Sequence, residues 1–232
     1  MKQLILSMLL LIVGHAVLGQ EKTDSHYLAF EQKLMDAGPQ AQILDARSEE
    51  EYAQNRVPGA VNIPTEAMVD KVGAHLDKRK PVFIYSIGNG RSAKVARHLR
   101  GIGFAEVYEF PGGLSKWIAR GKPVLSTGGE GLSLAAFNEQ ISADKLVLVE
   151  VGSRYCGGCK KLKPIVASLV AQNQSLVKLV DIEAYENKKL IQELAVDALP
   201  TLILYKGNKV IWRKQGLSSK DEINEELRKH KI

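Results

Sequence analysis

Hydrophobic and polar positions divide this chain into two blocks, each of which alternates apolar runs of strand length with helical patterns. Buried strands separated by helices are typical of α/β domains in which neighbouring strands run parallel. A turn at residues 206–209 predicts a hairpin between the last two runs. The apolar runs lie at residues 41–45, 61–64 and 82–85 in the first block, and at residues 145–151, 175–182, 199–205 and 210–212 in the second.

Helical patterns fill the segments between these runs. Ser48 followed by Glu51 forms a capping-box motif, which predicts a helix that begins directly after the serine. Ser219 and Glu222 form the same motif before the final helix. Pro164 lies inside a helical pattern, where it predicts a bend. The other helices are predicted at residues 26–35, with Leu28, Phe30 and Leu34 on the apolar face, and at residues 65–77, 92–100, 133–141, 160–172 and 186–194.

A segment rich in glycine, serine and threonine separates the two blocks at residues 126–131, and it contains no apolar anchor. We therefore expect a flexible linker at residues 126–132, between a first domain at residues 23–125 and a second domain at residues 133–232. The chain of 232 residues is long enough for two domains of ordinary size. No internal repeat relates the two blocks.

The N-terminal segment has the pattern of a secretory signal peptide. Lys2 supplies a positive charge, residues 4–18 are mostly apolar, and small residues precede a polar run that begins at Gln20. The apolar stretch is shorter and more interrupted than a membrane span of about 20 residues. We expect cleavage after Gly19, so that residues 1–19 form a signal peptide. The mature chain would then be exported to a bacterial periplasm or the extracellular space without a membrane span; an uncleaved anchor is the alternative.

Charge gives no indication of a nucleic-acid partner. The net charge of +6 is the balance of 32 basic and 26 acidic residues, which are mixed along the chain. No basic run is interleaved with aromatic residues, as nucleic-acid-binding surfaces often are. A mildly basic surface is the simpler interpretation.

The chain contains only two cysteines, Cys156 and Cys159, which lie three positions apart. Two thiols at C-x-x-C spacing form a reversible disulfide, a small structural bridge or part of a metal site. A zinc site needs about four ligands, and the histidines form no second cluster. A structural bridge that closes so small a loop would add little stability. The favoured interpretation is therefore a redox-active pair, with no metal and no other cofactor expected.

A second candidate site follows the apolar run at residues 82–85. Its two glycines and the helix expected after it can direct backbone N–H groups at an anion. It is not a nucleotide-binding P-loop, because no Gly-Lys-Ser/Thr follows at the required spacing. The residues of this loop are Ser86, Ile87, Gly88, Asn89, Gly90 and Arg91.

The first block resembles the rhodanese homology domain over most of its length. In that family the loop begins with a cysteine that carries a persulfide and closes with an arginine. Arg91 stands at the arginine position, but Ser86 stands where the cysteine is expected, so the resemblance implies a domain without sulfurtransferase activity. Either the loop still binds an anion or a thiol ligand, or the domain serves for docking or spacing. The matching residues are Ile43-Leu44-Asp45-Ala46-Arg47, Glu51-Tyr52, Val57-Pro58-Gly59-Ala60-Val61-Asn62-Ile63-Pro64, Gly103-Phe104, Val107-Tyr108, Gly112-Gly113, Trp117 and Gly121-Lys122-Pro123-Val124.

The second block resembles thioredoxin, which implies a mixed sheet with the cysteine pair between a strand and a helix. Pro164 matches the proline that bends the active-site helix of that family, and Leu199-Pro200-Thr201 matches its cis-proline turn. Glu150 stands six residues before Cys156, where the family has a buried acid. Lys178 is a gapped match to the lysine that partners this acid. The sequence departs from the family at Tyr155 and Gly158, where tryptophan and proline are usual.

The resemblance and the physical chemistry of thiols give each residue a role. A helix N-terminus stabilises a thiolate, so Cys156 is the expected nucleophile and Cys159 the resolving cysteine. Glu150 would exchange a proton with Cys159, and Pro200 would lie against the disulfide. The residues Gly157-Gly158 give no sign of unusual thiolate stabilisation, which favours a reductase or an isomerase over an oxidase.

We therefore expect an exported thiol-disulfide oxidoreductase that exchanges electrons with protein thiols and disulfides. It would need a membrane or soluble redox partner, and its rhodanese-like domain would be inactive. One rival is a persulfide relay, in which the C-x-x-C accepts sulfur from a donor held in the Ser86 loop. The other rival is a non-catalytic module that binds an anion or a partner.

Overall fold

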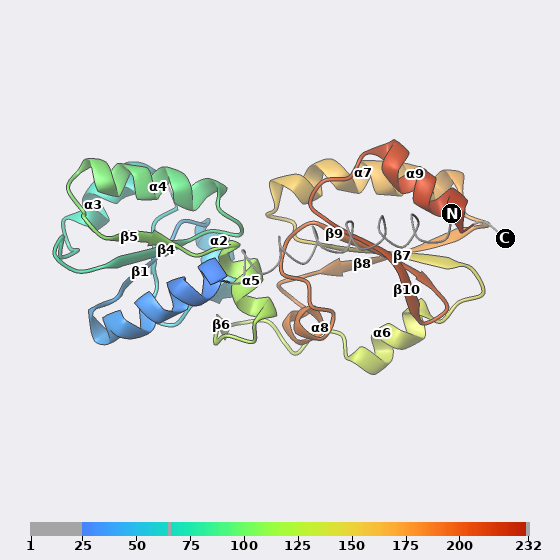
Figure 1. Cartoon of the computed structure of the whole chain (residues 1–232), viewed down its shortest axis with the longest axis horizontal. Coiled ribbons are helices and arrows are strands. Elements are labelled where there is room, and N and C mark those ends of the chain that lie inside the picture. The colour runs from blue at the N-terminus through green and yellow to red at the C-terminus, as the bar shows by residue number, and fades with distance from the viewer. Residues whose placement is uncertain (1–24, 65, 231–232) are drawn as a thin grey trace, which may run out of the picture.

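Figure 1 shows the computed structural model of the chain, which describes residues 25–64 and 66–230. The two sequence blocks form two α/β domains that lie side by side along the long axis of the molecule. The expected signal peptide at residues 1–19 lies outside the described residues. Among the described helices, none combines the length and the apolar character that a membrane span needs.

The first domain is built on a four-stranded sheet in the order β3-β1-β4-β5, and every neighbouring pair runs parallel. Strands β1 and β4 pair along their whole length, from Gln42 with Val82 to Asp45 with Tyr85. This arrangement confirms the expected parallel sheet. The strands are β1 (Gln42–Asp45), β3 (Val61–Asn62), β4 (Val82–Tyr85) and β5 (Val107–Glu109).

Helices cover both faces of this sheet, so that alternate residues of β4 enter different cores. Ile84 packs in a cluster with Val95 and Leu99 of α4. Phe83 and Tyr85 point to the other face, towards the helix at residues 25–37 and towards α5. The helices are α2 (Glu49–Gln54), α3 (Val69–Gly73), α4 (Gly90–Gly101) and α5 (Gly113–Ala119), with short 3-10 turns at Gly38–Gln40 and Glu66–Met68.

Short sequence motifs and the spacing of apolar residues predicted some of these helices correctly and others incorrectly. The capping box of Ser48 and Glu51 is formed, and α2 begins at Glu49 as expected. The helix expected at residues 65–77 is only a 3-10 turn followed by the five residues of α3. In the first helix, Leu28 is 58% exposed, whereas Tyr27 and Phe30 are buried, so the expectation for Leu28 was wrong.

The second domain has a mixed four-stranded sheet in the order β10-β9-β7-β8. Strands β7 and β8 run parallel, β9 runs antiparallel to β7, and β10 forms a hairpin with β9. Every residue of β7 is buried because this strand lies inside the sheet. The strands are β7 (Leu146–Gly152), β8 (Val177–Glu183), β9 (Thr201–Lys206) and β10 (Lys209–Gln215).

Two helices cover each face of the second sheet (Figure 1). Helices α7 and α9 lie on one face, where Leu162, Val166 and Leu227 enter one apolar cluster. Helices α6 and α8 lie on the other face, where Phe137 and Leu190 enter the larger cluster. The helices are α6 (Leu134–Ile141), α7 (Gly157–Gln172, with Pro164 inside it), α8 (Lys188–Glu193) and α9 (Lys220–Lys229).

The segment that was expected to be a flexible linker is attached at both ends. Strand β6 (Leu125–Ser126) pairs antiparallel with β2 (Asn55–Arg56), and Ser126 Oγ accepts a hydrogen bond from Lys188 Nζ. At the other end, the backbone N–H of Leu132 donates to Asn187 Oδ1. Gly131 has φ +75°, and a Cβ there would lie 2.2 Å from a backbone oxygen, so only glycine fits.

Candidate functional site

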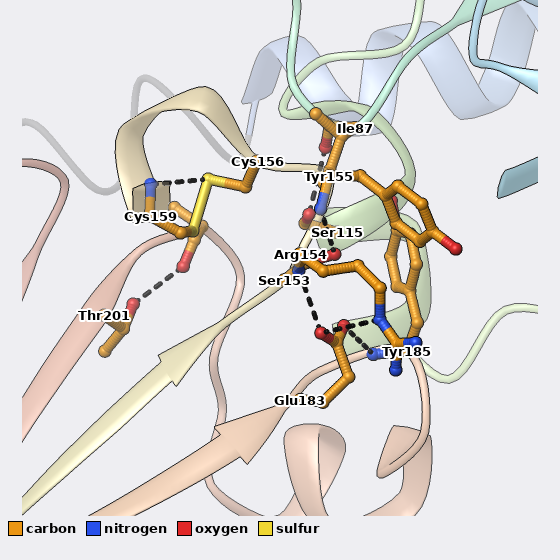
Figure 2. The surroundings of a disulfide bond; sticks show 11 residues. Ile87, Ser115, Ser153, Arg154, Tyr155, Cys156, Cys159, Glu183, Tyr185 and Thr201 are labelled. Atoms are coloured by element: carbon orange, nitrogen blue, oxygen red, sulfur yellow. Dashed lines mark hydrogen bonds and ion pairs between the residues drawn. A yellow bond between two sulfur atoms is a disulfide. The ribbon is translucent and has the colours of Figure 1, made fainter. Parts of the chain in front are cut away.

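The cysteine pair lies where β7 ends and α7 begins (Figure 2). Strand β7 is buried along its length and ends at Gly152, so it fixes the position of the short loop that precedes Cys156. Cys156 is the N-cap of α7, and its Sγ accepts a hydrogen bond from the backbone N–H of Cys159 at 3.2 Å. The two cysteines are joined in a disulfide with their Cα atoms 5.2 Å apart. The N-terminus of a 16-residue helix therefore points at Cys156, where it favours a negatively charged sulfur.

Gly152 and Gly158 leave little space around this disulfide. A Cβ at Gly152 would lie 3.4 Å from Cys159 Sγ. A Cβ at Gly158 would lie 3.1 Å from Cδ of Pro200, which follows Leu199 through a cis peptide bond. Pro200 therefore lies against the first turn of α7.

Glu150 lies inside β7, near the end of the strand that leads to the cysteine pair. Its side chain is 2% exposed, and its Oε2 has no hydrogen-bond partner among the described residues. Burial, and after it the negative charge of Asp181, raise the pKa of Glu150 to about 7 against the opposing effect of Lys163. The carboxyl group can therefore gain and lose a proton near neutral pH.

A small cavity is lined by both Glu150 and Cys159. Its volume of about 90 Å³ is enough for a few water molecules, and charged side chains in its lining can hydrogen-bond to them. Water in the cavity could carry a proton between the Glu150 carboxyl group and the Cys159 sulfur. The residues that line the cavity are Glu150, Gly152, Ser153, Arg154, Cys159, Lys160, Lys163, Asp181 and Glu183.

The lysine expected beside Glu150 was wrong. Lys178 donates to the backbone oxygen of Gln140 and is paired in register with Val147, three residues away along β7. The charges that act on Glu150 are instead those of Asp181, its register partner on β8, and of Lys163. Lys163 Nζ and Asp181 Oδ2 form an ion pair at 2.6 Å.

The two missed residues differ in how they could have been found. Lys163 stands four positions after Cys159 on the same helix, so the helical period places it one turn away on the same face. Asp181 needed the register between β7 and β8, which no local pattern supplies.

The loop from Ser86 to Arg91 is assembled, but its polar groups are bound within the first domain. Ser86 is buried, and its hydroxyl donates to the backbone oxygen of Gly88 at 2.7 Å. Arg91 makes two hydrogen bonds to the carboxylate of Glu51, at 2.5 and 2.7 Å. Burial alone would raise the pKa of Glu51, but the bonds from Arg91 hold it below its ordinary value. The guanidinium charge expected to face an anion is therefore neutralised.

The start of α5 holds the other side of this loop. The backbone oxygens of Ser86 and Ile87 accept hydrogen bonds from the N–H groups of Leu114 and Ser115. A Cβ at Gly113 would lie 2.5 Å from the oxygen of Ser86. The structure thus brings the six predicted loop residues together, but it shows no base beside the Ser86 hydroxyl among the hydrogen bonds of the described residues.

Comparison with known proteins assigns the two halves of the chain to two families. Residues 130–229 match the family model described as Thioredoxin, and residues 29–120 match the model described as Rhodanese-like domain. The thioredoxin of Chlamydia trachomatis is 35% identical over 89 residues, which are 38% of this chain and 85% of that protein. Thioredoxin H5 of Arabidopsis thaliana is 30% identical over 102 residues, which are 42% of this chain and 85% of that protein. These matches confirm both resemblances seen in the sequence.

Proposed function

Because the chain belongs to the thioredoxin family through its C-terminal domain, we propose that it is an exported thiol-disulfide oxidoreductase that acts on protein disulfides. A rhodanese-like domain is joined to this thioredoxin-like redox domain. The observation that carries the proposal is the placement of Cys156 at the N-terminus of α7, with Pro200 against the same turn and Glu150 behind Cys159.

Reduction of a substrate follows from this geometry in two steps. In the reduced protein, the thiolate of Cys156 attacks one sulfur of the substrate disulfide; a bond forms between them, and the other substrate sulfur leaves as a thiolate. The thiolate of Cys159 then attacks Cys156 Sγ, which closes the disulfide seen here and releases the second substrate sulfur. Two electrons have passed to the substrate, so an external dithiol must reduce the pair before the next turnover.

Glu150 supports the second step as a general base. Cys159 must lose its proton before it can attack, and Glu150 borders the cavity on which Cys159 also lies. Its pKa of about 7 means that near neutral pH the carboxyl group is partly ionised and can accept this proton. In the reverse direction the same group returns the proton.

The first domain contributes no reactive group in this proposal. A serine cannot carry a persulfide, and the Ser86 hydroxyl donates to a carbonyl oxygen rather than to a base. Arg91 is paired with Glu51 instead of facing an open anion site. We therefore assign the domain a docking role, which weighs against the persulfide relay and against the anion-binding module.

Export, and action as a reductase or isomerase, are parts of the proposal that rest on the sequence. Residues 1–19 have the pattern of a signal peptide. A periplasmic or extracellular reductase would receive its electrons from a membrane or soluble redox partner. The reduction potential of the pair, measured in glutathione buffers, separates the two directions: a value of about −270 mV indicates a reductase, and one of about −120 mV an oxidant.

Reduction of insulin disulfides with dithiothreitol as electron donor tests the activity. The wild-type protein should accelerate the reaction, and a Cys156→Ala variant should match dithiothreitol alone. A Cys159→Ala variant should instead accumulate a mixed disulfide through Cys156, because the resolving thiol is missing. If the Cys156→Ala variant reduced insulin as fast as the wild type, the proposed function would be refuted.

A further inference from the structure

A tyrosine of the second domain is buried against the first domain. Tyr185 follows β8 and is 1% exposed. Its ring centroid lies 5.5 Å from the guanidinium carbon of Arg47, and its backbone oxygen accepts a hydrogen bond from the side chain of Asn55. Arg47 is itself fully buried and paired with Asp45. The second domain therefore contacts the first beside a buried ion pair, where water is excluded.

The apolar cores of the two domains are also continuous. One cluster contains Phe110 and Trp117 of the first domain together with Ile182 and Leu190 of the second. In Figure 1, α5 of the first domain lies next to α8 of the second. Domains joined by a buried apolar interface keep a fixed relative position, whereas domains with small polar interfaces move.

This fixed interface extends to the cysteine pair through Tyr155, which directly precedes Cys156. The Tyr155 hydroxyl donates to Glu50 Oε1 of the first domain at 2.8 Å. The rings of Tyr155 and Tyr185 lie 6.3 Å apart, so the two tyrosines form one edge of the interface. The tyrosine found in place of the usual tryptophan thus ties the active-site loop to the first domain.

The loop that lacks its cysteine lies on the same side of the site. Figure 2 shows Ile87 and Ser115 of the first domain among the residues around the disulfide. Ile87 packs against the shared apolar core, and its backbone oxygen accepts a hydrogen bond from the hydroxyl of Ser115. The Ser86 loop is therefore used for packing beside the thioredoxin-like site.

An exposed apolar side chain also lies beside the site. Leu217 is 55% exposed, and its Cδ2 lies 3.8 Å from the position of a Cβ on Gly158, next to Pro200. Cys156 itself is only 5% exposed, so little of this residue is accessible to a partner. A flexible segment can enter along Leu217 and Pro200. The hydrogen bond between Glu50 and Tyr155 places the first domain beside the residue that precedes Cys156, where it restricts the approach of a rigid surface.

We infer that the first domain is a fixed wall of the thiol-disulfide site, which admits disulfides in extended, flexible peptide segments and excludes those on rigid folded surfaces. This inference rests on the proposed function and assigns its substrate class. The wall is formed by the helix that carries Glu50 and by the Ser86 loop. Tyr155 and Tyr185 hold it in place.

Two substrates that share one disulfide loop test the wall in the full-length protein. One is a synthetic peptide closed by a single disulfide, and the other is a small folded domain that displays the same loop on its surface. The wild-type protein should reduce the peptide with a kcat/KM at least tenfold higher than that for the folded domain. Equal values would overturn the inference, and failure to reduce either substrate would refute the proposed function instead.

A pair of tyrosine variants separates the wall from general destabilisation. Tyr185→Ser loosens the interface and should raise kcat/KM for the folded domain at least fivefold, with the peptide unchanged within twofold. Tyr205→Ser removes an equally buried tyrosine, which packs on Phe137 inside the second domain, and should change the ratio of the two rates less than twofold. If the two variants gave the same ratio, the first domain would not be a wall.

A charge variant gives a second test that does not disturb a buried side chain. Glu50 is exposed and lies next to Tyr155. At low salt, the Glu50→Lys variant should therefore reduce peptides whose disulfide is flanked by aspartate with a kcat/KM at least threefold higher than that for peptides flanked by lysine. Glu139→Lys makes the same charge change on the exposed side of α6 and should leave the preference unchanged. Equal effects of the two substitutions would place the substrate away from the first domain and overturn the inference.

Discussion

Replacing Glu150 by glutamine should make the oxidised protein more stable, and this gain should grow with pH. The Glu150 carboxyl group is 2% exposed and has an Oε2 without a hydrogen-bond partner among the described residues, so its ionised form is poorly solvated. Burial and the charge of Asp181 raise its pKa to about 7, against an ordinary value of 4.5. Glutamine has nearly the same shape but carries no charge at any pH.

The size of the effect follows from the difference between these two pKa values. The folded protein holds the Glu150 proton up to pH values near 7, whereas the unfolded chain releases it near 4.5. The stability of the wild type therefore falls as the pH rises through this interval, because the unfolded state gains from ionisation first. The cost to the wild type is about 1 kcal/mol at pH 5 and about 3 kcal/mol at pH 8.

Urea unfolding of the wild type and Glu150→Gln at pH 5 and pH 8, with the disulfide intact, measures this cost. The variant should gain about 2 kcal/mol more at pH 8 than at pH 5, which shifts the unfolding midpoint by about 1 M urea. Glu139→Gln makes the same chemical change on the exposed side of α6 and is the matched control. A gain that is the same at both pH values would show that Glu150 is not held protonated by burial, and the reasoning would be refuted.

The same substitution should slow catalysis, because glutamine cannot accept the proton of Cys159. Insulin reduction by Glu150→Gln should be slower than by the wild type. The change in rate near pH 7 that comes from ionisation of Glu150 should also be absent. Asp181→Asn removes a charge that raises the pKa of Glu150, so this change in rate should move to lower pH. Lys163→Met removes a charge that lowers it, so there the change in rate should move to higher pH. A pH profile unchanged in all three variants would exclude Glu150 from the proton transfer.

Two further substitutions test other contacts of the described structure. Gly158→Ala places a Cβ 3.1 Å from Pro200 and should lower kcat/KM for insulin about tenfold. Gly157→Ala places its Cβ in open space and should have little effect. Equal rates for the two variants would show that the close contact between residue 158 and Pro200 is not needed. Arg91→Ala leaves the buried carboxylate of Glu51 without its partner and should cost about 2 kcal/mol at pH 7. Burial alone would raise the pKa of Glu51, so in the variant this carboxyl group should gain its proton at a higher pH than in the wild type. The cost should therefore shrink as the pH falls through the acidic range; a pH-independent cost in thermal unfolding would contradict it.

Features that depend on short stretches of sequence were predictable. The capping box of Ser48 and Glu51 needs only four adjacent residues, and the structure forms it. The spacing of Cys156 and Cys159 allows a small bridge, which the structure forms, and the burial of Glu150 follows from its place in an apolar run. Such features are encoded by the residues that form them, so one sequence is enough to find them.

Features that depend on distant residues were missed or misplaced. The choice of Lys178 followed the family pattern, but the register of β8 on β7 brings Asp181 beside Glu150 instead. The hydrogen bond between Tyr155 and Glu50 joins residues 105 positions apart, and that between Asn55 and Tyr185 joins residues 130 apart. No periodicity or local motif reports on such pairs, because they are set by how the two domains pack.

The missing cysteine at Ser86 and the tyrosine at 155 have one explanation when the two domains are considered together. A rhodanese loop that carries a persulfide needs open access, but here the loop carbonyls are bound by α5 and Arg91 is paired with Glu51. A loop without a reactive sulfur can instead be covered, and Ile87 and Tyr155 both pack against the core that the domains share. Because the first domain moves no electrons in this scheme, it can act only through its position. Substitutions on its wall should therefore change which disulfides are reduced, while the rate with a small soluble disulfide stays that of the wild type.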